Sequence, residues 1–337
     1  MKNLLCTILL LFFSTNQLNA QQVTSCFADG CHGDLISKKN IHPIVSDDCF
    51  NCHEGEKSSH PIKQGSEFTL PEESPSLCYT CHDDLITTEI TKSVHPPYEE
   101  DCLVCHNPHS SDNDNLMEET VPDLCYFCHD DPNELENVSS IHNAINLEKK
   151  CMNCHSPHSS KHYSLLLQEE IILCLSCHNK KIKSDDKIIE NISKKIEVEE
   201  EAHPPVVMDG CSTCHNPHSS QSGSLLLDKF PTGNYASGIK DNYSLCFNCH
   251  DEEAFTEEIT NEDTEFRNGS TNLHFVHVNK DKSRSCTNCH DVHGSKNEHL
   301  ISEEMSFGKI KMKLNFRVTE TGGSCSPGCH DQKNYKR

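Results

Sequence analysis

Strict alternation of apolar and polar residues marks one segment of this chain, close to its C-terminus. The run Ile310-Lys-Met-Lys-Leu-Asn-Phe-Arg-Val318 alternates at every position, which predicts a β-hairpin arm. Residues 179–202 and 251–273 are charged and mostly acidic, which is typical of solvated linkers or exposed helices. For the rest of the chain we expect little regular secondary structure, only short helices and coil.

An apolar stretch at the N-terminus is typical of a secretory signal. Lys2 supplies the positive start, residues 4–13 form the apolar stretch, and Leu18-Asn19-Ala20 resembles a small-residue cleavage site. The stretch is too short to span a bilayer, and no later segment has the roughly 18 apolar residues that a spanning helix needs. We therefore expect residues 1–20 to be a signal peptide and the protein to be exported, with no membrane span. Cys6 is then a small apolar residue of the signal.

The composition leaves too little apolar material for an ordinary core. Only 34% of the 337 residues are hydrophobic and 6% are aromatic, and there is no Trp. Cores as thin as this need disulfides, metals or cofactors. The chain contains 23 Cys and 24 His, so groups bound by these residues are expected to replace much of the missing core.

Every cysteine beyond the signal belongs to one sequence pattern. Nine times the chain reads Cys-x-x-Cys-His, and two further pairs are stretched, with four residues between Cys26 and Cys31 and three between Cys325 and Cys329. The cysteines of the nine standard motifs are Cys49, Cys52, Cys78, Cys81, Cys102, Cys105, Cys125, Cys128, Cys151, Cys154, Cys174, Cys177, Cys211, Cys214, Cys246, Cys249, Cys286 and Cys289. The histidines that close the eleven motifs are His32, His53, His82, His106, His129, His155, His178, His215, His250, His290 and His330.

This pattern has the chemistry of c-type haem attachment. Two thiols add across the vinyl groups on one edge of a porphyrin, and the adjacent His reaches the iron from one face. Disulfides are the alternative in an oxidising compartment, but a disulfide has no use for the following His, and zinc would need a fourth ligand at each site. The repetition predicts about eleven covalently bound haems, with at least nine at the standard motifs. A local disulfide stays open as the alternative at each stretched motif.

A second set of histidines recurs in register with the motifs. Those that precede the first motif of a pair by seven to nine residues are His42, His95, His142, His203 and His277. Those that follow a motif histidine by three residues are His109, His158, His218 and His293. With His60, which follows His53, these are predicted to be distal iron ligands that give bis-His haems of low potential. His274 and His299 are further candidates, His162 is interpreted as a spare, and the sequence leaves open which distal histidine serves which haem.

The motifs form five pairs behind a single N-terminal motif, which defines a repeat. A unit reads His, Cys-x-x-Cys-His, often Asn/Ser-Pro-His-Ser-Ser, a leucine-rich run, and Leu-Cys-x-x-Cys-His. The predicted organisation is a single-haem segment at 21–48, then repeat 1 at 49–94, repeat 2 at 95–141, repeat 3 with a charged insertion at 142–202, repeat 4 with an acidic insertion at 203–273, and repeat 5 with the β arm at 274–337. So few residues per motif require closely packed haems, and without haem we expect a mostly unfolded chain.

The paired motifs, with the runs CHNPHSS and LCxxCH, resemble the doubled-CXXCH family of multihaem cytochromes c over essentially the whole mature chain. The chain is also similar to periplasmic decahaem cytochromes that pass electrons through outer-membrane porins, although the stretched motifs and the ending GGSCSPGCH differ from that type. The resemblance implies a multihaem cytochrome c fold, in which short helices and coil wrap round closely packed haems. It also implies redox partner proteins, such as a porin–cytochrome complex or a terminal reductase.

Three functions are compatible with this pattern. An electron carrier without catalysis fits best, because closely spaced haems exchange electrons and the protein only positions and tunes them. The net charge of −23 disfavours nucleic acid and anionic lipid as partners and favours a basic patch on a redox partner. A nitrite, hydroxylamine or sulfur-oxyanion reductase would need one iron with an open position. A filament linked through surplus histidines such as His162 or His274 is the third alternative. We expect a periplasmic or extracellular electron carrier.

Overall fold

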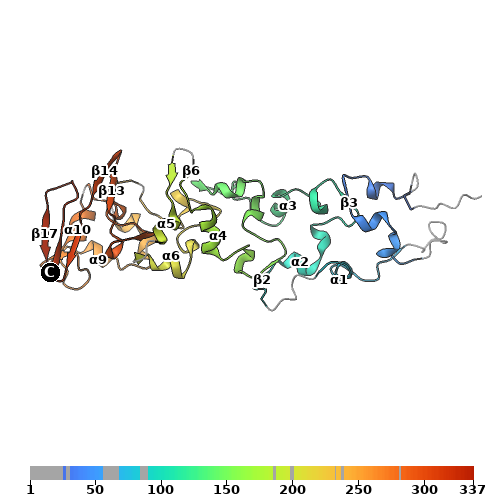
Figure 1. Cartoon of the computed structure of the whole chain (residues 1–337), viewed down its shortest axis with the longest axis horizontal. Helices are drawn as coiled ribbons and strands as arrows, with labels where there is room; N and C mark the ends of the chain where they lie inside the picture. Colours follow the sequence, from blue (N-terminus) through green and yellow to red (C-terminus); the bar gives the residue numbers. More distant parts are fainter. Residues whose placement is uncertain are drawn as a thin grey trace, which may run out of the picture. The chain divides into compact units, whose positions relative to one another are not determined.

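The computed structural model describes residues 26–27, 31–55, 68–83, 90–184, 187–197, 201–231, 233–236, 239–280 and 282–337. The predicted signal peptide at 1–20, Cys6 and the distal candidate His60 lie outside these residues. Regular structure is sparse, as the sequence predicts: the helices are short and most strands pair two by two (Figure 1). Within the described ranges, no helix has the length and apolar character needed to cross a bilayer.

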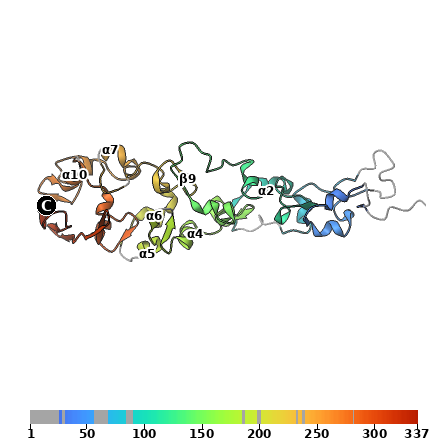
Figure 2. The same ribbon diagram turned by 90° about the horizontal axis from the view of Figure 1, so that it is seen from above.

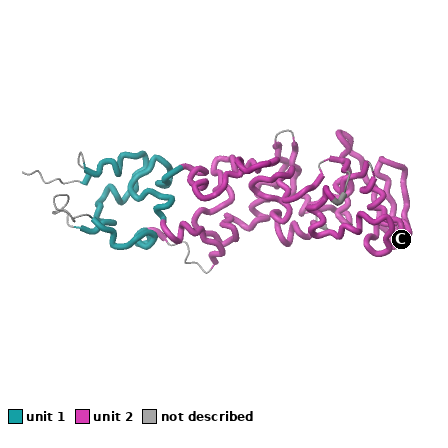
Figure 3. The backbone as a smooth tube through the Cα atoms, turned by 180° about the vertical axis from the view of Figure 1, so that it is seen from behind, with its two compact units in different colours: residues 1–80, 102–119 teal, residues 81–101, 120–337 magenta. Residues whose placement is uncertain are grey.

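The described residues fall into two compact units (Figure 3). Unit 1 lies within residues 1–80 and 102–119, and unit 2 lies within residues 81–101 and 120–337. The unit boundary passes through the motif that begins at Cys78.

Short helices of two types carry the motifs. The first motif of each repeat begins in a 3-10 turn, namely η3 (Cys49–Asn51), η4 (Cys102–Val104), η7 (Lys150–Asn153), η9 (Cys211–Thr213) and η11 (Cys286–Asn288). Second motifs begin in an α-helix, namely α1 (Ser76–Tyr79), α3 (Asp123–Tyr126), α4 (Glu170–Cys177) and α8 (Ser244–Phe247). The second motif of repeat 5 instead begins at the end of strand β16 (Gly322–Cys325). The short helices η1 (Gly33–Ile36) and α7 (Ile239–Asn242) carry no motif cysteine.

The leading histidines of repeats 1 to 4 stand immediately before a helix, in extended backbone. The helices that they precede are η2 (Pro43–Ser46), α2 (Pro96–Glu100), η6 (Asn143–Asn146) and α6 (Pro204–Met208). Three of these helices begin with proline, whose fixed φ and missing N–H suit the first helical position. Each of these leading histidines therefore occupies a defined N-cap position.

Two-residue strands join each repeat to the next. The strand before a leading histidine pairs antiparallel with a strand after the first motif of the following repeat. The pairs are β1 (Asn40–Ile41) with β3 (Ser110–Ser111), β2 (Ser93–Val94) with β5 (Ser159–Ser160), β4 (Ser140–Ile141) with β9 (Ser219–Ser220), and β8 (Glu201–Ala202) with β12 (Gly294–Ser295). Beside each pair, the amide of the leading histidine donates to the carbonyl of the histidine that lies three residues after the first motif of the following repeat, at 2.8–3.1 Å. The Pro-His-Ser-Ser runs are thus contacts between repeats.

Both charged insertions fold, which differs from the expectation of plain linkers or exposed helices. The first contains β6 (Ile182–Ser184), β7 (Lys187–Ile189) and α5 (Ile192–Ile196). Figures 1 and 2 show α5 beside α4 and α6 in unit 2. The second contains α9 (Glu253–Thr256), β10 (Arg267–Asn268) and β11 (Thr271–Asn272), and leads into α10 (Leu273–Val278). Asn272 is fully buried, and its side-chain oxygen accepts from the His274 amide at 2.9 Å, so this insertion fixes the start of α10.

The alternating run near the C-terminus forms two strands in two different sheets. β14 (Ile310–Lys313) pairs with β13 (Glu304–Phe307), which confirms a β-hairpin but places its first strand before the run. β15 (Arg317–Thr319) instead pairs with β16, which also pairs with β17 (Lys333–Lys336). The run breaks at Leu314, which is 2% exposed, and Asn315, whose φ is 45°. A buried side chain followed by a left-handed residue ends the first strand.

The buried apolar side chains of the described residues form only two small clusters. The clusters are Ala236, Tyr243 and Val278, and Ile301, Met305 and Leu314. Both belong to the C-terminal part of unit 2, where the insertions and the β strands are longest. The thin core agrees with the composition.

Candidate haem-binding sites

Seven pairs of histidine rings face each other across a gap that fits one iron ion. Their centroids are 5.9–6.5 Å apart and their planes are inclined by 6–30°. Two imidazoles that bind one metal ion from opposite sides have centroids about 6 Å apart, since each metal–nitrogen bond is about 2 Å and the nitrogen lies about 1 Å from the ring centre. The pairs are His53–His109, His95–His129, His142–His178, His155–His218, His203–His250, His215–His293 and His274–His290.

Two rules describe six of these pairs. The leading histidine of a repeat faces the second motif histidine of the same repeat, as in His95–His129, His142–His178 and His203–His250. The histidine three residues after a motif faces the first motif histidine of the preceding repeat, as in His53–His109, His155–His218 and His215–His293. The second rule follows from the strand pairs, which bring the segment after each first motif back onto the repeat before it.

In repeat 5, the first motif histidine has its partner within the same repeat. His290 faces His274 of α10, and the ring centroids are 6.5 Å apart. His277 lies three residues further along α10, which places both histidines on one side of the helix. The sequence identified His274 as a candidate but gave no partner for it.

Hydrogen bonds fix the proton on one nitrogen of several paired rings. The Nδ1 atoms of His95 and His142 lie 3.0 and 2.9 Å from the carbonyl oxygens of Pro157 and Pro217. A carbonyl oxygen only accepts, so Nδ1 carries the proton and Nε2 keeps the lone pair that a metal needs. Histidines that bind metals almost always make such a bond with their second nitrogen.

The leucine-rich run supplies the corresponding acceptor for the first motif histidine. Nδ1 donates to the carbonyl nine residues later, at 2.8–3.0 Å, in the pairs His106–Asn115, His155–Ser164, His215–Ser224 and His290–His299. These acceptors lie in the turns η5 (Asp114–Leu116), η8 (Tyr163–Leu165), η10 (Gly223–Leu225) and η12 (Glu298–Leu300), where the last two residues have positive φ. The second strand serine then donates through Oγ to the residue after the turn, as Ser160 does to Leu166. The run therefore orients the imidazole, which the sequence did not reveal.

Burial favours the uncharged form of several of the paired imidazoles. It lowers the pKa of His274 to about 3, with a smaller contribution from the charge of His290, and it lowers the pKa of His293 to about 4. The pKa values of His215 and His290 are lowered by burial as well. A neutral imidazole is the form that binds a metal ion.

The motif thiols lie close to one another across repeat boundaries. All 22 described cysteines are free thiols. The Cys125 side chain forms a hydrogen bond with that of Cys151, and this bond lowers the pKa of the Cys151 thiol to about 6. The Cys174 side chain makes the same contact with Cys211. The second motif of one repeat therefore lies against the first motif of the next.

The stretched N-terminal motif follows the same geometry. Cys26 forms a side-chain hydrogen bond with Cys49, as a second motif does before the next repeat. The His32 amide donates to the Cys26 carbonyl at 3.1 Å, and in standard motifs the same bond is 2.9 or 3.0 Å long. The stretched motif, with two extra residues between its cysteines, thus keeps the hydrogen bond from the histidine amide to the first cysteine carbonyl.

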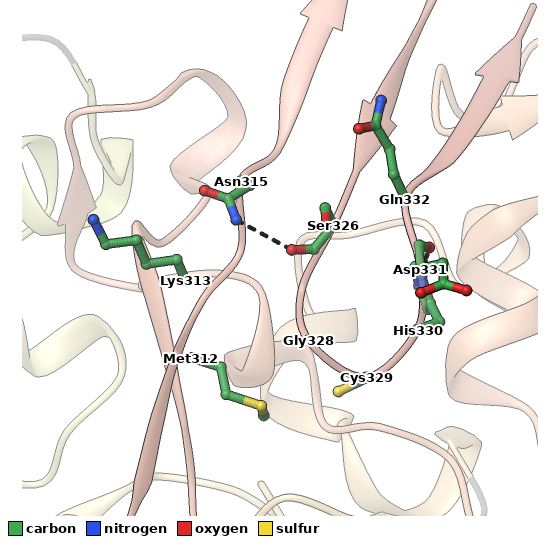
Figure 4. Close-up of a pocket in the computed structure, with 9 residues that line it drawn as sticks. All are labelled: Met312, Lys313, Asn315, Ser326, Gly328, Cys329, His330, Asp331 and Gln332. Carbon is green, nitrogen blue, oxygen red and sulfur yellow. Dashed lines mark hydrogen bonds between the residues drawn. The ribbon is translucent and has the colours of Figure 1, made fainter.

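The stretched C-terminal motif borders a pocket of about 720 Å³ (Figure 4). Cys329 and His330 are exposed, and both line the pocket together with Lys313. This volume is within the range in which proteins bind cofactor-sized ligands. His277 lies near enough that the charge of His330, after the larger effect of burial, lowers its pKa. The Nδ1 of His277 donates to the Leu273 carbonyl at 2.6 Å, so this motif also has a second histidine with the tautomer that a haem requires.

Other histidines named from the sequence have different surroundings. His299 is exposed, and its carbonyl rather than its ring contacts His290. His162 accepts and donates hydrogen bonds through its backbone, with Ser93 and Ser160. Four further histidines named from the sequence lie in different units. His42 and His106 belong to unit 1, and His82 and His158 belong to unit 2.

Sequence reasoning did not identify three residues near the paired histidines, because these residues come from the charged insertions. The rings of Phe255 and Phe266 pack edge-on against His274, with centroids 5.1 and 5.2 Å away. Lys195 of α5 forms an ion pair with Asp291, with its Nζ 2.6 Å from Oδ2. Asp291 precedes His293 by two residues, and its Oδ1 accepts from the His293 amide at 3.3 Å.

Of the residues near the paired histidines that sequence reasoning missed, only Asp291 could have been found from the sequence, by comparison between repeats. Repeats 2 and 4 have Asn107 and Asn216 at the same place after the motif, and both side chains accept from the amide two residues later at 3.0 Å. Repeat 5 therefore replaces a neutral acceptor with a carboxylate.

A protein-family model described as the doubled CXXCH motif matches five segments of the chain, at residues 42–87, 95–134, 142–183, 203–255 and 277–308. Together the segments cover more than half of the chain, and each begins at a leading histidine. No match was found among curated proteins.

Proposed function

Because the chain belongs to the doubled CXXCH motif family and is a multihaem c-type cytochrome, we propose that it carries electrons along eleven covalently bound haems and catalyses no reaction of its own. The seven histidine pairs carry this proposal. An iron with imidazole on both faces has no position for a substrate, and a reductase needs such a position.

Each motif binds one haem in this proposal. Its two thiols form the thioether bonds and its histidine binds the iron. The second iron ligands are the facing histidines of the seven pairs, and His277 serves the motif that ends at His330. The contact of Cys26 with Cys49 and the pocket beside Cys329 support haem at both stretched motifs.

The residues of the chain contribute position, protonation state and exclusion of water. Haem iron supplies reversible one-electron exchange when it is bound. The strand pairs between repeats fix one site relative to the next, and burial favours the neutral form of imidazoles such as those of His274 and His293. Carbonyl acceptors at Nδ1 make Nε2 a stronger electron donor, which stabilises the oxidised iron and favours a low potential.

Export and redox partners complete the proposal. The apolar stretch at residues 4–13 supports export to the periplasm or cell surface. Electrons would be exchanged there with other redox proteins, such as a porin–cytochrome complex or a terminal reductase.

Haem content and spin state test the proposal directly. Purified, matured protein is expected to contain eleven haems per chain by intact mass and by the pyridine haemochrome assay. Its oxidised form should give only low-spin signals in electron paramagnetic resonance. A stoichiometry of nine would remove haem from the stretched motifs. A high-spin signal that nitrite or hydroxylamine perturbs would favour a reductase.

Asp291 and Lys195 are expected to shift the potential of the haem between His215 and His293 in opposite directions. Asp291→Asn keeps the hydrogen bond seen in repeats 2 and 4 but removes a negative charge, so the potential should rise. Lys195→Gln leaves the carboxylate uncompensated, so the potential should fall. An effect on the order of 1 kcal/mol corresponds to about 40 mV for one electron.

The measurement is a spectroelectrochemical titration of each variant against the wild type. Each difference curve should have the amplitude of one haem in eleven. Shifts of the same sign in both variants would show that the pair acts through local structure and not through its charges.

A further inference from the structure

The last 34 residues have a charge opposite to that of the rest of the chain. We call residues 304–337 the C-terminal arm; it contains β13 to β17. Its basic residues are Lys309, Lys311, Lys313, Arg317, Lys333, Lys336 and Arg337, and its acidic residues are Glu304, Glu320 and Asp331. The arm therefore has a net charge of +4 (seven minus three), whereas the whole chain has −23, which leaves −27 on residues 1–303.

The lysines of the hairpin are available to a partner. Lys309, Lys311 and Lys313 are exposed, and neither Lys309 nor Lys313 forms an ion pair with any residue that the structure describes. Ile310 between them is 62% exposed. An apolar residue surrounded by charged side chains is a common arrangement at the centre of a transient interface.

The same surface reaches the last haem motif. Lys313 lines the pocket beside Cys329 and His330, and both motif residues are exposed (Figure 4). By contrast, Cys289 and His290 of the preceding motif are only partly exposed. The cationic surface thus lies at the motif where a bound haem would be accessible to another protein.

We propose that the C-terminal arm docks an acidic redox protein, which exchanges electrons with the haem at Cys325, Cys329 and His330; this rests on the proposed function. In each encounter the reduced partner loses one electron and one ferric iron gains it, and no covalent bond changes. Positive charge around the exchange site raises the rate of encounter with an acidic partner. The acidic remainder of the chain disfavours binding of that partner elsewhere.

The test uses the haem-loaded protein and a small acidic [2Fe–2S] ferredoxin as the probe. The arm variant carries Lys309→Gln, Lys311→Gln and Lys313→Gln. The control variant carries Lys92→Gln, Lys149→Gln and Lys161→Gln, which are exposed residues of unit 2 outside the arm and change the net charge equally. The dissociation constant is measured with both proteins oxidised, and the rate of reduction by reduced ferredoxin is measured at increasing ionic strength.

The arm variant is expected to weaken ferredoxin binding and to slow its reduction by three- to tenfold, while the control variant stays close to wild type. The wild-type rate should fall as ionic strength rises, because attraction at the arm is screened. Equal losses in both variants, or a wild-type rate that rises with salt, would overturn the proposal. Binding to vesicles containing phosphatidylserine that is lost in the arm variant, without any change in ferredoxin rate, would also overturn it in favour of a membrane surface.

Haem content and reduction by dithionite separate the two proposals. Protein that lacks haem, or that dithionite fails to reduce, contradicts the proposed function. Fully loaded and reducible protein whose reaction with ferredoxin is independent of the arm contradicts only the docking proposal.

Discussion

Replacement of His218 by methionine is expected to alter the haem at Cys151 and Cys154, one repeat upstream, and to leave the haem of its own repeat unchanged. His218 is three residues from His215 in sequence, but its ring faces His155, with centroids 5.9 Å apart. Methionine as the sixth ligand raises the potential, on the order of 0.1 V within the span of about 0.8 V over which axial ligands act. A redox titration and the sulfur-to-iron charge-transfer band measure this change.

His162→Met is the matched control for this variant. His162 belongs to repeat 3, as Cys151 and Cys154 do, but its hydrogen bonds with Ser93 and Ser160 are made by its backbone, so no new band is expected. To locate the altered haem, His218→Met is combined with alanine at Cys151 and Cys154, which should abolish the band. If the band survives there and disappears instead with alanine at Cys211 and Cys214, ligation within a single repeat is correct and ligation between repeats is wrong.

The chain without haem is expected to lose essentially all of its stable tertiary structure. Its two apolar clusters contain three buried residues each among the described residues, and its histidine pairs place neutral rings on either side of a gap. Without iron and porphyrin in those gaps, burial cannot offset the conformational entropy of ordering the chain. The expected loss is the whole folding free energy, typically about 5–15 kcal/mol for a domain.

Protein produced without haem maturation provides the measurement. Differential scanning calorimetry should show no cooperative transition, and amide hydrogen exchange should show little protection, whereas the loaded protein should show both. Reducing agent is kept present so that adjacent thiols such as Cys125 and Cys151 stay unbonded. A cooperative transition in the reduced, haem-free chain would mean that the polypeptide folds on its own.

Spacing alone predicted the chemistry of the sites, because thiols and imidazole must be neighbours in sequence to hold one porphyrin. It also predicted sparse secondary structure, since a chain with this composition has no apolar face to bury. The leading histidines and those after the motifs were recognised because their register recurs.

The assignment of partners was beyond the sequence because it depends on contacts between repeats. His218 faces His155 only because β4 and β9 pair, and strands of two residues leave no periodic pattern. His274 faces His290 because Asn272 fixes the start of α10. Lys195 lies in a segment whose charge pattern resembles any solvated insertion, and only its distance from Asp291 distinguishes it.

Ligation between repeats, as proposed, would give the growing chain two classes of haem site. Synthesis proceeds from the N-terminus, so His95, His142 and His203 are already present when the second motifs that they face are made. The first motifs of repeats 3 and 4 lack this advantage: the site at His155 stays open on one side until His218 has emerged, and that at His215 stays open until His293 has emerged. A newly made repeat therefore completes the first-motif site of the repeat before it. In a chain interrupted between repeats, the iron at the first motif of the final repeat made would be exposed to solvent.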